Sequence, residues 1–261
     1  MHRLVAIVLL ALATALAVGC GGRQAPDPTN YTEAARYEWD RAEGIFDRRD
    51  YEYARSLYND LMLQYPYSQY AVLAELRIAD TYYRERSWAR AIETYRRFVR
   101  FHPSHPSVPE AQYRIASAHV EQMPNDWFAM PPSHERDLRE AQNAYAALRG
   151  FIGVYGDTEW ADDAREELVV VRDRLAAHEL YVAEFYMRDD NPVAAGQRAR
   201  YLIDNYPEAT DVPNALFIYA RAMLQLGNTD DAVVALRRLS VEFGDTARGR
   251  DARRYLDEFG L

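Results

Sequence analysis

The stretch YEYARSLYNDLMLQYPYSQYA, residues 51–71, decides the fold of this chain. Apolar side chains recur at helical spacing as far as Tyr65. Pro66 then stops the helix, because proline lacks a backbone N–H and its ring clashes with the preceding turn. Ser68 follows closely, where its hydroxyl can cap a new helix. The stretch therefore predicts one helix, a tight turn and the start of a second helix.

The same ending recurs four more times along the chain. Each copy places a Pro or Gly after an apolar-periodic stretch, with a Ser or Thr close behind. The spacings between the Pro or Gly residues are 37, 53, 51 and 37, which is typical of helix-turn-helix repeats with two insertions. The five copies are Tyr65-Pro66-Tyr67-Ser68, His102-Pro103-Ser104, Tyr155-Gly156-Asp157-Thr158, Tyr206-Pro207-Glu208-Ala209-Thr210 and Phe243-Gly244-Asp245-Thr246.

Small residues keep phase with these endings. An alanine stands twelve residues before each Pro or Gly, and another stands twelve residues earlier in every repeat but the third. Antiparallel helices approach closely where a small side chain faces a large one, and each pair must bury its open face on the next. The pattern resembles the tetratricopeptide repeat and predicts an all-α solenoid of about five helix-turn-helix repeats over residues 33–261. A generic helical bundle with chance alanines is the alternative. The alanines are Ala54, Ala91, Ala144, Ala195 and Ala232 in the second helices, and Ala42, Ala79, Ala183 and Ala220 in the first helices.

The third repeat is interrupted between its two helices. Three prolines surround the pair Trp127-Phe128 in residues 123–132, which predicts a loop. The loop either contacts a partner or packs back on the solenoid as a hydrophobic plug. Residues 161–185 predict a long amphipathic helix or a nearly continuous pair, with Val170, Leu175, Leu180 and Val182 among its apolar positions.

The N-terminal end resembles the signal of a bacterial lipoprotein. A basic head precedes an apolar run from Leu4 to Val18, which is shorter than the roughly 20 residues of a membrane-spanning helix. Small residues then lead to the single cysteine, Cys20, as in a lipobox. The resemblance implies that residues 1–19 are a signal peptide and that Cys20 is lipidated; an ordinary signal peptide with an incidental cysteine is the alternative. Residues 20–32 would be the lipidated N-terminus and a flexible tether, and Gly21 in place of an aspartate favours the outer membrane, facing the periplasm.

Charge and motifs exclude several classes of function. The net charge is −9, so nucleic acid is not an expected partner. All 31 basic residues are arginine, whose planar guanidinium suits carboxylates. The chain contains no H-E-x-x-H, P-loop, G-x-S-x-G or G-x-G-x-x-G motif, and its six histidines form no evident metal set. We therefore expect a binding protein with no catalytic residues, no metal and no cofactor.

From Tyr37 onward the chain resembles the BamD (ComL-type) family of outer-membrane assembly lipoproteins. The first repeat, residues 51–71, carries part of the match, as does Glu135-Arg136-Asp137 before the second helix of the third repeat. The narrowest match is RDRLAAHELYVAEFY, residues 172–186. The resemblance implies a scaffold that binds the periplasmic domains of an Omp85-type barrel insertase, together with accessory assembly lipoproteins. It also implies that the chain helps deliver unfolded outer-membrane proteins for insertion.

Two candidate surfaces follow as hypotheses. The first is a groove for an extended substrate peptide on the first helices of repeats one to three, where aromatic and charged residues alternate; packing between repeats is the alternative for each of them. The groove residues are Trp39, Glu43, Phe46, Asp80, Tyr83, Arg84 and Tyr113.

The second surface surrounds Arg198, which is similar to a family arginine that docks on the insertase. The alternative is an ordinary surface arginine paired within its own helix, but its neighbours three and four residues away are not acidic. Pro192 and Gly196 make this helix less regular in sequence than its counterparts.

Two other classes of function remain open. One is a repeat lipoprotein that serves another periplasmic complex, either as a pilotin or as a coordinator of envelope division; such families share the lipobox and the repeats but not the phrase from Asp173 to Tyr186. The other is a lipoprotein enzyme acting on peptidoglycan, for which no nucleophile and base stand out.

Overall fold

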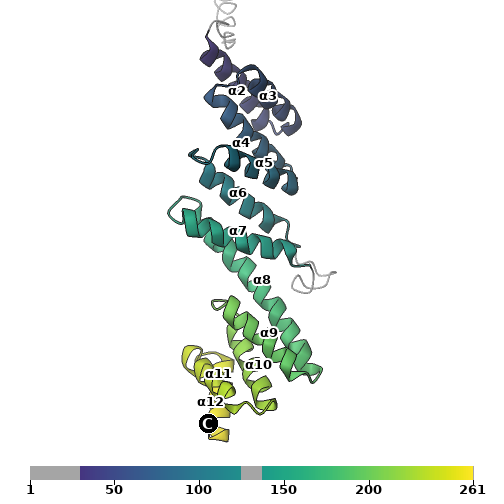
Figure 1. Cartoon of the computed structure of the whole chain (residues 1–261), viewed down its shortest axis with the longest axis vertical. Helices are drawn as coiled ribbons and strands as arrows, with labels where there is room; N and C mark the ends of the chain where they lie inside the picture. The colour runs from purple at the N-terminus through teal and green to yellow at the C-terminus, as the bar shows by residue number, and fades with distance from the viewer. Residues whose placement is uncertain (1–29, 125–136, 261) are drawn as a thin grey trace, which may run out of the picture. The chain divides into compact units, whose positions relative to one another are not determined.

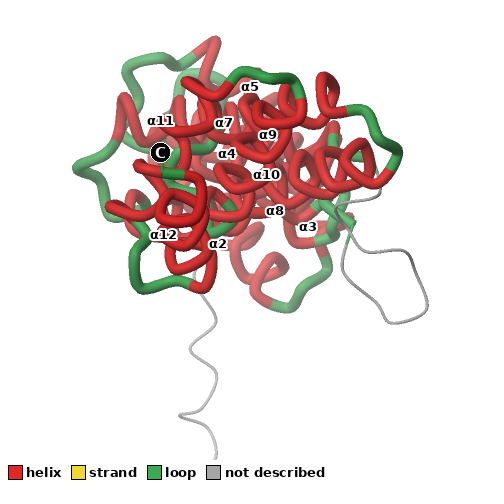
Figure 2. The backbone as a smooth tube through the Cα atoms, turned by 90° about the horizontal axis from the view of Figure 1, so that it is seen from below, coloured by secondary structure: helices red, strands yellow, loops and turns green. Residues whose placement is uncertain are grey.

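The computed structural model describes residues 30–124 and 137–260 of the chain. Within these ranges the backbone is helix and loop without strands, as the colours of Figure 2 show. The eleven described helices follow one another along the chain, as labelled in Figure 1. Their bounds are α2 (Tyr31–Asp47), α3 (Tyr51–Gln64), α4 (Gln69–Arg84), α5 (Trp88–Phe101), α6 (Val108–Glu121), α7 (Arg139–Tyr155), α8 (Ala161–Arg188), α9 (Pro192–Asn205), α10 (Val212–Gln225), α11 (Thr229–Glu242) and α12 (Ala247–Phe259).

The helices from α2 to α11 form the five predicted pairs, which confirms the all-α tetratricopeptide-repeat architecture. All nine alanines in phase with the repeat endings are completely buried. After the last pair, α12 packs on α10 and α11. It therefore covers a face that a sixth repeat would otherwise have to bury.

The second helix of every pair ends at its predicted stop. The helices α3, α5, α7, α9 and α11 end one or two residues before the Pro or Gly of each copy. The residues before the three prolines, Tyr65, His102 and Tyr206, have φ values of −129°, −127° and −129°. Proline disfavours the helical region for the residue before it, so the helix stops there.

The hydroxyl caps expected behind these stops are present in two of the five copies. Ser68 Oγ accepts from the N–H of Ala71, and Thr246 Oγ1 accepts from the N–H of Gly249. The expectation is wrong for Ser104, Thr158 and Thr210, because α6, α8 and α10 begin further along, after Ser107, Trp160 and Asp211. None of those three N-cap positions carries a side-chain cap bond.

The turns inside the pairs share a backbone feature that the sequence conceals. A residue with positive φ stands in the turn of four pairs: Arg49 (64°), Arg86 (58°), Asp190 (53°) and Gly227 (75°). Only glycine adopts this region without cost. In three of these turns the next residue caps the following helix through its side chain, namely Asp50, Asn191 and Asn228. The polar caps of these second helices therefore lie in the turns inside the pairs, whereas the Pro or Gly phrases precede the first helices.

The chain divides into two compact units, with the boundary inside α4 between Thr81 and Tyr82. In the first unit, α2 begins at Tyr31, two residues before the expected start of the solenoid at residue 33, because Asn30 Oδ1 accepts from the N–H of Glu33 and caps the helix there. Its core centres on Tyr58 and Leu61 of α3. No helix within residues 30–124 and 137–260 is long and apolar enough to cross a membrane.

In the second unit, α8 is a single unbroken helix of 28 residues, which decides for one long helix between the two alternatives for residues 161–185. It contacts α6, α7, α9 and α10, so it is the central element of this unit. Leu175 and Leu180 lie on its buried face together with Val171, whereas Val170 is exposed.

The irregularity predicted for α9 is absent. Pro192 occupies the first turn, where the missing N–H costs no helical hydrogen bond. Gly196 lies against α10: a Cβ there would stand 2.8 Å from Met223 Cε. The glycine leaves this space to the flexible end of Met223, so it fits the close packing of α9 on α10.

Candidate partner-binding surfaces

Four of the predicted groove residues belong to the first unit, and three of them form an internal network. Arg77 of α4 donates from Nε to Glu43 Oε1 and from Nη2 to Glu43 Oε2, both at 3.1 Å. Its Nη1 donates to Asp80 Oδ2 at 3.0 Å. Tyr58 of α3 donates its hydroxyl proton to the same Glu43, and Arg77 Cζ lies 5.3 Å from the centre of the Phe46 ring. We call Glu43, Phe46, Tyr58, Arg77 and Asp80 the arginine cluster.

The arginine cluster is electrostatically self-contained. Burial alone would lower the pKa of Arg77, but the adjacent carboxylates of Glu43 and Asp80 outweigh it and raise this pKa above its usual value. Burial, with the hydrogen bond to Glu43, raises the pKa of the Tyr58 hydroxyl. Two carboxylates thus surround one guanidinium, which joins α2 to α4 and leaves no positive charge over for a ligand.

Trp39, also in the first unit, packs against aromatic neighbours. Its ring centre lies 5.7 Å from that of Tyr58 and 6.0 Å from that of Tyr70. The side chain is half-buried, so part of the indole remains accessible. Glu43 and Asp80 therefore hold Arg77 within the first unit, whereas the rings of Trp39 and Phe46 are both half-buried; of these two, Trp39 lies outside the arginine cluster.

The other three groove residues lie in the second unit. Tyr113 of α6 is buried, stacks on Trp160 with 5.4 Å between ring centres, and donates to Glu167 Oε1 at 3.1 Å. Because Tyr113 is buried, the structure favours packing between repeats over peptide binding for this residue. Tyr83 is half-buried, with its hydroxyl 3.1 Å from Ser117 Oγ, and Arg84 is exposed at the end of α4.

Glu167 has a solvent-shielded carboxylate oxygen that sequence reasoning missed. Its Oε1 accepts from Tyr113 and from Ser117 Oγ (2.9 Å), but no described residue bonds its Oε2, which is out of contact with solvent. Burial raises the pKa of Glu167, and the hydrogen bonds from Ser117 and Tyr113 oppose this only in part. The signal that could have found it is helical spacing: Glu167 lies three residues after Ala164 and four before Val171, both buried, whereas the preceding acidic residues of α8 are exposed.

Arg198 of α9 is paired, although not within its own helix. Its Nη1 donates to Glu179 Oε2 of α8 at 3.2 Å. The side chain of Glu179 is 12% exposed, whereas that of Arg198 is 47% exposed. One helical turn further along, Tyr201 is also exposed. Glu179 thus holds a guanidinium that still faces solvent beside an accessible aromatic ring, and Arg and Tyr are among the residue types that dominate binding energy at protein interfaces.

Glu179 belongs to the phrase of residues 172–186, in which Arg172 and Arg174 also contact residues outside α8. Arg172 donates to Asp173 Oδ1 and to Glu208 Oε2, both at 3.0 Å. Arg174 donates to the carbonyl of Pro124 at 2.9 Å. The phrase therefore fixes α8 to its neighbours and presents Arg198 through Glu179. Its buried apolar members include Leu175, Ala176 and Ala183.

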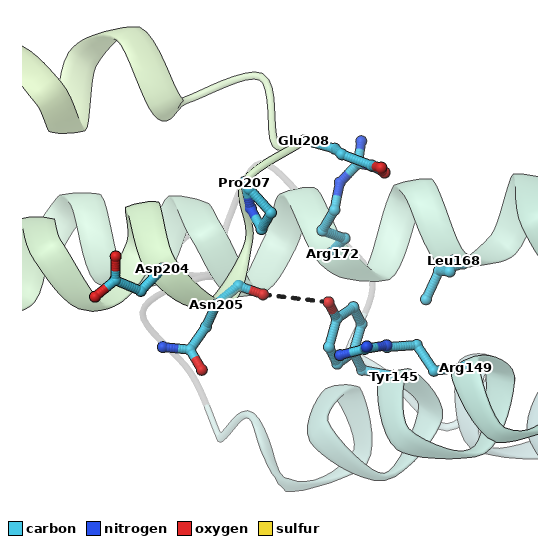
Figure 3. Close-up of a pocket in the computed structure, with 8 residues that line it drawn as sticks. All are labelled: Tyr145, Arg149, Leu168, Arg172, Asp204, Asn205, Pro207 and Glu208. Carbon is cyan, nitrogen blue, oxygen red and sulfur yellow. Dashed lines mark hydrogen bonds and ion pairs between the residues drawn. The ribbon is translucent and has the colours of Figure 1, made fainter. Parts of the chain in front are cut away.

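A hollow of about 360 Å³ lies beside Arg172, between α7, α8 and the turn after α9. In Figure 3, Tyr145 reaches across it and donates to the carbonyl of Asn205 at 3.4 Å. Arg149 lies alongside, with its Cζ 5.6 Å from the Tyr145 ring centre. The lining side chains Tyr145, Arg149 and Arg172 thus already make contacts within the chain. Among the described residues, no three His, Cys, Asp or Glu side chains are grouped to hold a metal ion.

Three predicted features lie outside the described residues. They are the lipidation site Cys20, the pair Trp127-Phe128 and the residues Glu135 and Arg136 of the family phrase.

Comparison with known proteins identifies the family. The model of a family described as "YfiO: Outer membrane lipoprotein" matches residues 32–238. The chain therefore belongs to this family of outer membrane lipoproteins. It is 29% identical over 259 residues to the outer membrane protein assembly factor BamD of Caulobacter vibrioides, covering 98% of this chain and 81% of that protein.

Other relatives carry the same description. The chain is 28% identical over 204 residues to outer membrane protein assembly factor BamD of Neisseria meningitidis serogroup A, covering 77% of this chain and 76% of the relative. Among solved structures, the TPR2AB domain of yeast Sti1, in a complex with pHSP90, overlaps 87% of this chain and 86% of that chain at 13% identity and a TM-score of 0.41.

Proposed function

We propose that this chain is a non-catalytic assembly factor of outer-membrane proteins. It scaffolds the periplasmic domains of an Omp85-type barrel insertase, binds accessory assembly lipoproteins and helps deliver unfolded β-barrel proteins. The observation that carries this proposal is the family match over residues 32–238, joined to relatives described as outer membrane protein assembly factors. The repeat architecture supports it, because stacked helix pairs offer extended surfaces for several protein partners.

Arg198 is the proposed docking residue for the insertase. Its guanidinium is half-exposed and oriented by Glu179, so a partner carboxylate can approach the free side of the fork. Tyr201 supplies adjacent aromatic surface. The proposed contact thus combines Arg198, which Glu179 already orients, with Tyr201. Ordering these two side chains on binding should therefore cost little conformational entropy.

The docking role is tested with Arg198→Glu and a matched control, Arg200→Glu. Arg200 is on the same helix, is exposed and pairs with Asp204 within α9. Binding of the full chain to the insertase's purified periplasmic domains should weaken at least tenfold in Arg198→Glu and stay within twofold in Arg200→Glu. Equal binding by both variants would refute the docking role.

We further propose that unfolded substrate contacts Trp39 in the first unit and, separately, Tyr83 and Arg84 in the second. Trp39 and Tyr83 are half-buried and Arg84 is exposed, and none of the three belongs to the arginine cluster. A photo-crosslinking residue at each position should label an unfolded barrel protein more strongly than one at the exposed positions Leu63 or Val154 of second helices. Labelling confined to Leu63 and Val154 would contradict the proposal.

The anchoring proposal concerns residues 1–32. A signal peptide over residues 1–19, lipidation at Cys20 and a tether over 20–32 would hold residues 33–261 at the outer membrane, facing the periplasm; acyl chains add about 0.8 kcal/mol per buried methylene. The variant Cys20→Ser should leave the outer-membrane fraction. Retention of the variant there, at the level of the unaltered chain, would contradict lipid anchoring.

A further inference from the structure

A second hollow of the second unit is lined by arginines from three helices, α8, α10 and α12. Its volume is about 320 Å³. On α10, its lining residues recur at positions i, i+3, i+4 and i+7, so they lie on one face of the helix. The lining residues are Glu184, Met187 and Arg188 of α8, Asn214, Phe217, Ile218 and Arg221 of α10, and Arg248 of α12.

Arg248 is fixed within this hollow. Its Nε donates to Asn214 Oδ1 at 3.1 Å, and its Cζ lies 4.6 Å from the centre of the Phe217 ring. Its ion-pair partner, Asp251, lies 3.5 Å from Nη1 and is shared with Arg254. The guanidinium is therefore oriented by a neutral amide and a ring, and only partly neutralised.

The other two arginines carry charge that the chain leaves largely uncompensated. Arg221 is exposed and has no ion-pair partner within the described residues. Arg188 lies 4.0 Å from Glu184, at the outer limit of an ion pair, and both side chains are about half-exposed. Three arginines thus face one glutamate in the lining, on a chain whose overall charge is −9. On an otherwise acidic protein, this locally positive hollow attracts anions more strongly than the surrounding surface does.

Apolar residues complete the lining. Phe217 and Ile218 are buried, Arg248 covers the Phe217 ring, and Met187 of α8 is half-buried. The groups that a ligand can reach are therefore mainly the guanidinium groups, whose planar forks are complementary to a carboxylate.

We infer that this hollow binds a carboxylate of an extended peptide through the guanidinium groups of Arg188, Arg221 and Arg248. The carboxylate comes from an aspartate or glutamate side chain or from a chain end. The site shares no residue with the Arg198 contact on α9, and it does not depend on the assembly role. It gives the chain a second recognition element for an acidic segment of a partner.

The test uses fluorescein-labelled eight-residue peptides and the full chain. The first peptide is Gly-Ser-Ala-Asp-Phe-Ala-Ser-Gly with an amidated end; the second replaces its aspartate by asparagine; the third has no charged side chain but ends in phenylalanine with a free carboxylate. Fluorescence anisotropy should show binding of the first or third peptide at least tenfold tighter than of the second. The tighter of the two identifies the source of the carboxylate.

The variant Arg221→Gln/Arg248→Gln should lose this binding by at least tenfold, and raised salt should weaken it. Arg200→Gln/Arg250→Gln removes the same charge from exposed arginines outside the hollow and should bind within twofold of the unaltered chain. Circular dichroism checks that both variants fold. Equal binding of all three peptides, no binding of any, or equal losses in both double variants would overturn the inference.

Discussion

The two units of the chain use arginine in opposite ways. In the first unit, Arg77 is enclosed by Glu43 and Asp80 and fixes α4 to α2. In the second unit, Arg221 and Arg248 face a hollow in which arginines outnumber carboxylates. An arginine on a repeat helix is therefore not by itself a binding residue. The number of carboxylates around it decides between a structural and a recognition role.

The largest expected effect comes from breaking the arginine cluster. Arg77→Met removes the guanidinium that bonds two partly buried carboxylates, Glu43 and Asp80. We expect a loss of about 2–3 kcal/mol in the free energy of unfolding, somewhat below the cost for a fully buried pair because Arg77 is 37% exposed. Urea denaturation followed by circular dichroism measures it.

A neutralised control sharpens this prediction. Glu43→Gln/Arg77→Met/Asp80→Asn removes all three charges and should recover part of the loss, since no buried charge is then unpaired. If Arg77→Met costs less than about 0.5 kcal/mol, the typical range for surface substitutions, the cluster is not structural.

Arg198→Glu should have a smaller effect on stability than Arg77→Met. It replaces an ion pair between a half-exposed guanidinium and the largely buried carboxylate of Glu179 with two like charges, and we expect a loss of about 1–2 kcal/mol. A loss as large as that of Arg77→Met would mean that Arg198 is mainly structural. Thermal unfolding monitored by circular dichroism separates the two cases.

Glu167 provides a pH-dependent comparison. Because burial raises its pKa in the folded chain, the neutral carboxyl is favoured there, and its stabilising contribution is complete below the unfolded pKa, near 4.5. That contribution is lost as the pH rises through the folded pKa. Relative to Glu167→Gln, the unaltered chain should therefore lose stability between pH 4 and pH 7. A difference in unfolding free energy that stays constant over this range would contradict the assignment.

The smallest expected effect is that of Arg221→Gln on stability. Arg221 has no ion-pair partner within the described residues, so its removal should change the free energy of unfolding by less than about 0.5 kcal/mol. The same substitution should weaken carboxylate binding. In urea denaturation, a loss above about 1 kcal/mol would show that the hollow is structural after all.

The sequence predicted the repeat architecture well because its signals are local. A proline or glycine placed directly after an apolar-periodic stretch ends the helix there, and alanine occupies the positions of close helix contact in nearly every repeat. The inner turns were harder, because three of the four residues with positive φ are Arg49, Arg86 and Asp190, which give no local signal.

The candidate surfaces were predicted less completely than the fold. Glu43 and Tyr113 have residue types suited to binding, but their packing depends on Arg77 and Glu167, which lie 34 and 54 positions away in the chain. For the same reason the sequence did not pair Arg198 with Glu179, 19 positions earlier. Helical spacing relates neighbours within one helix, whereas these contacts are between helices.

The most direct test of the proposed function is affinity capture of the tagged full chain from detergent-solubilised native membranes, read by mass spectrometry. The proposal predicts recovery of an Omp85-type barrel insertase together with further small lipoproteins, and less of the insertase with Arg198→Glu than with Arg200→Glu. Recovery of a secretin or of envelope-division proteins without such a barrel would contradict it and assign the repeats to another envelope complex.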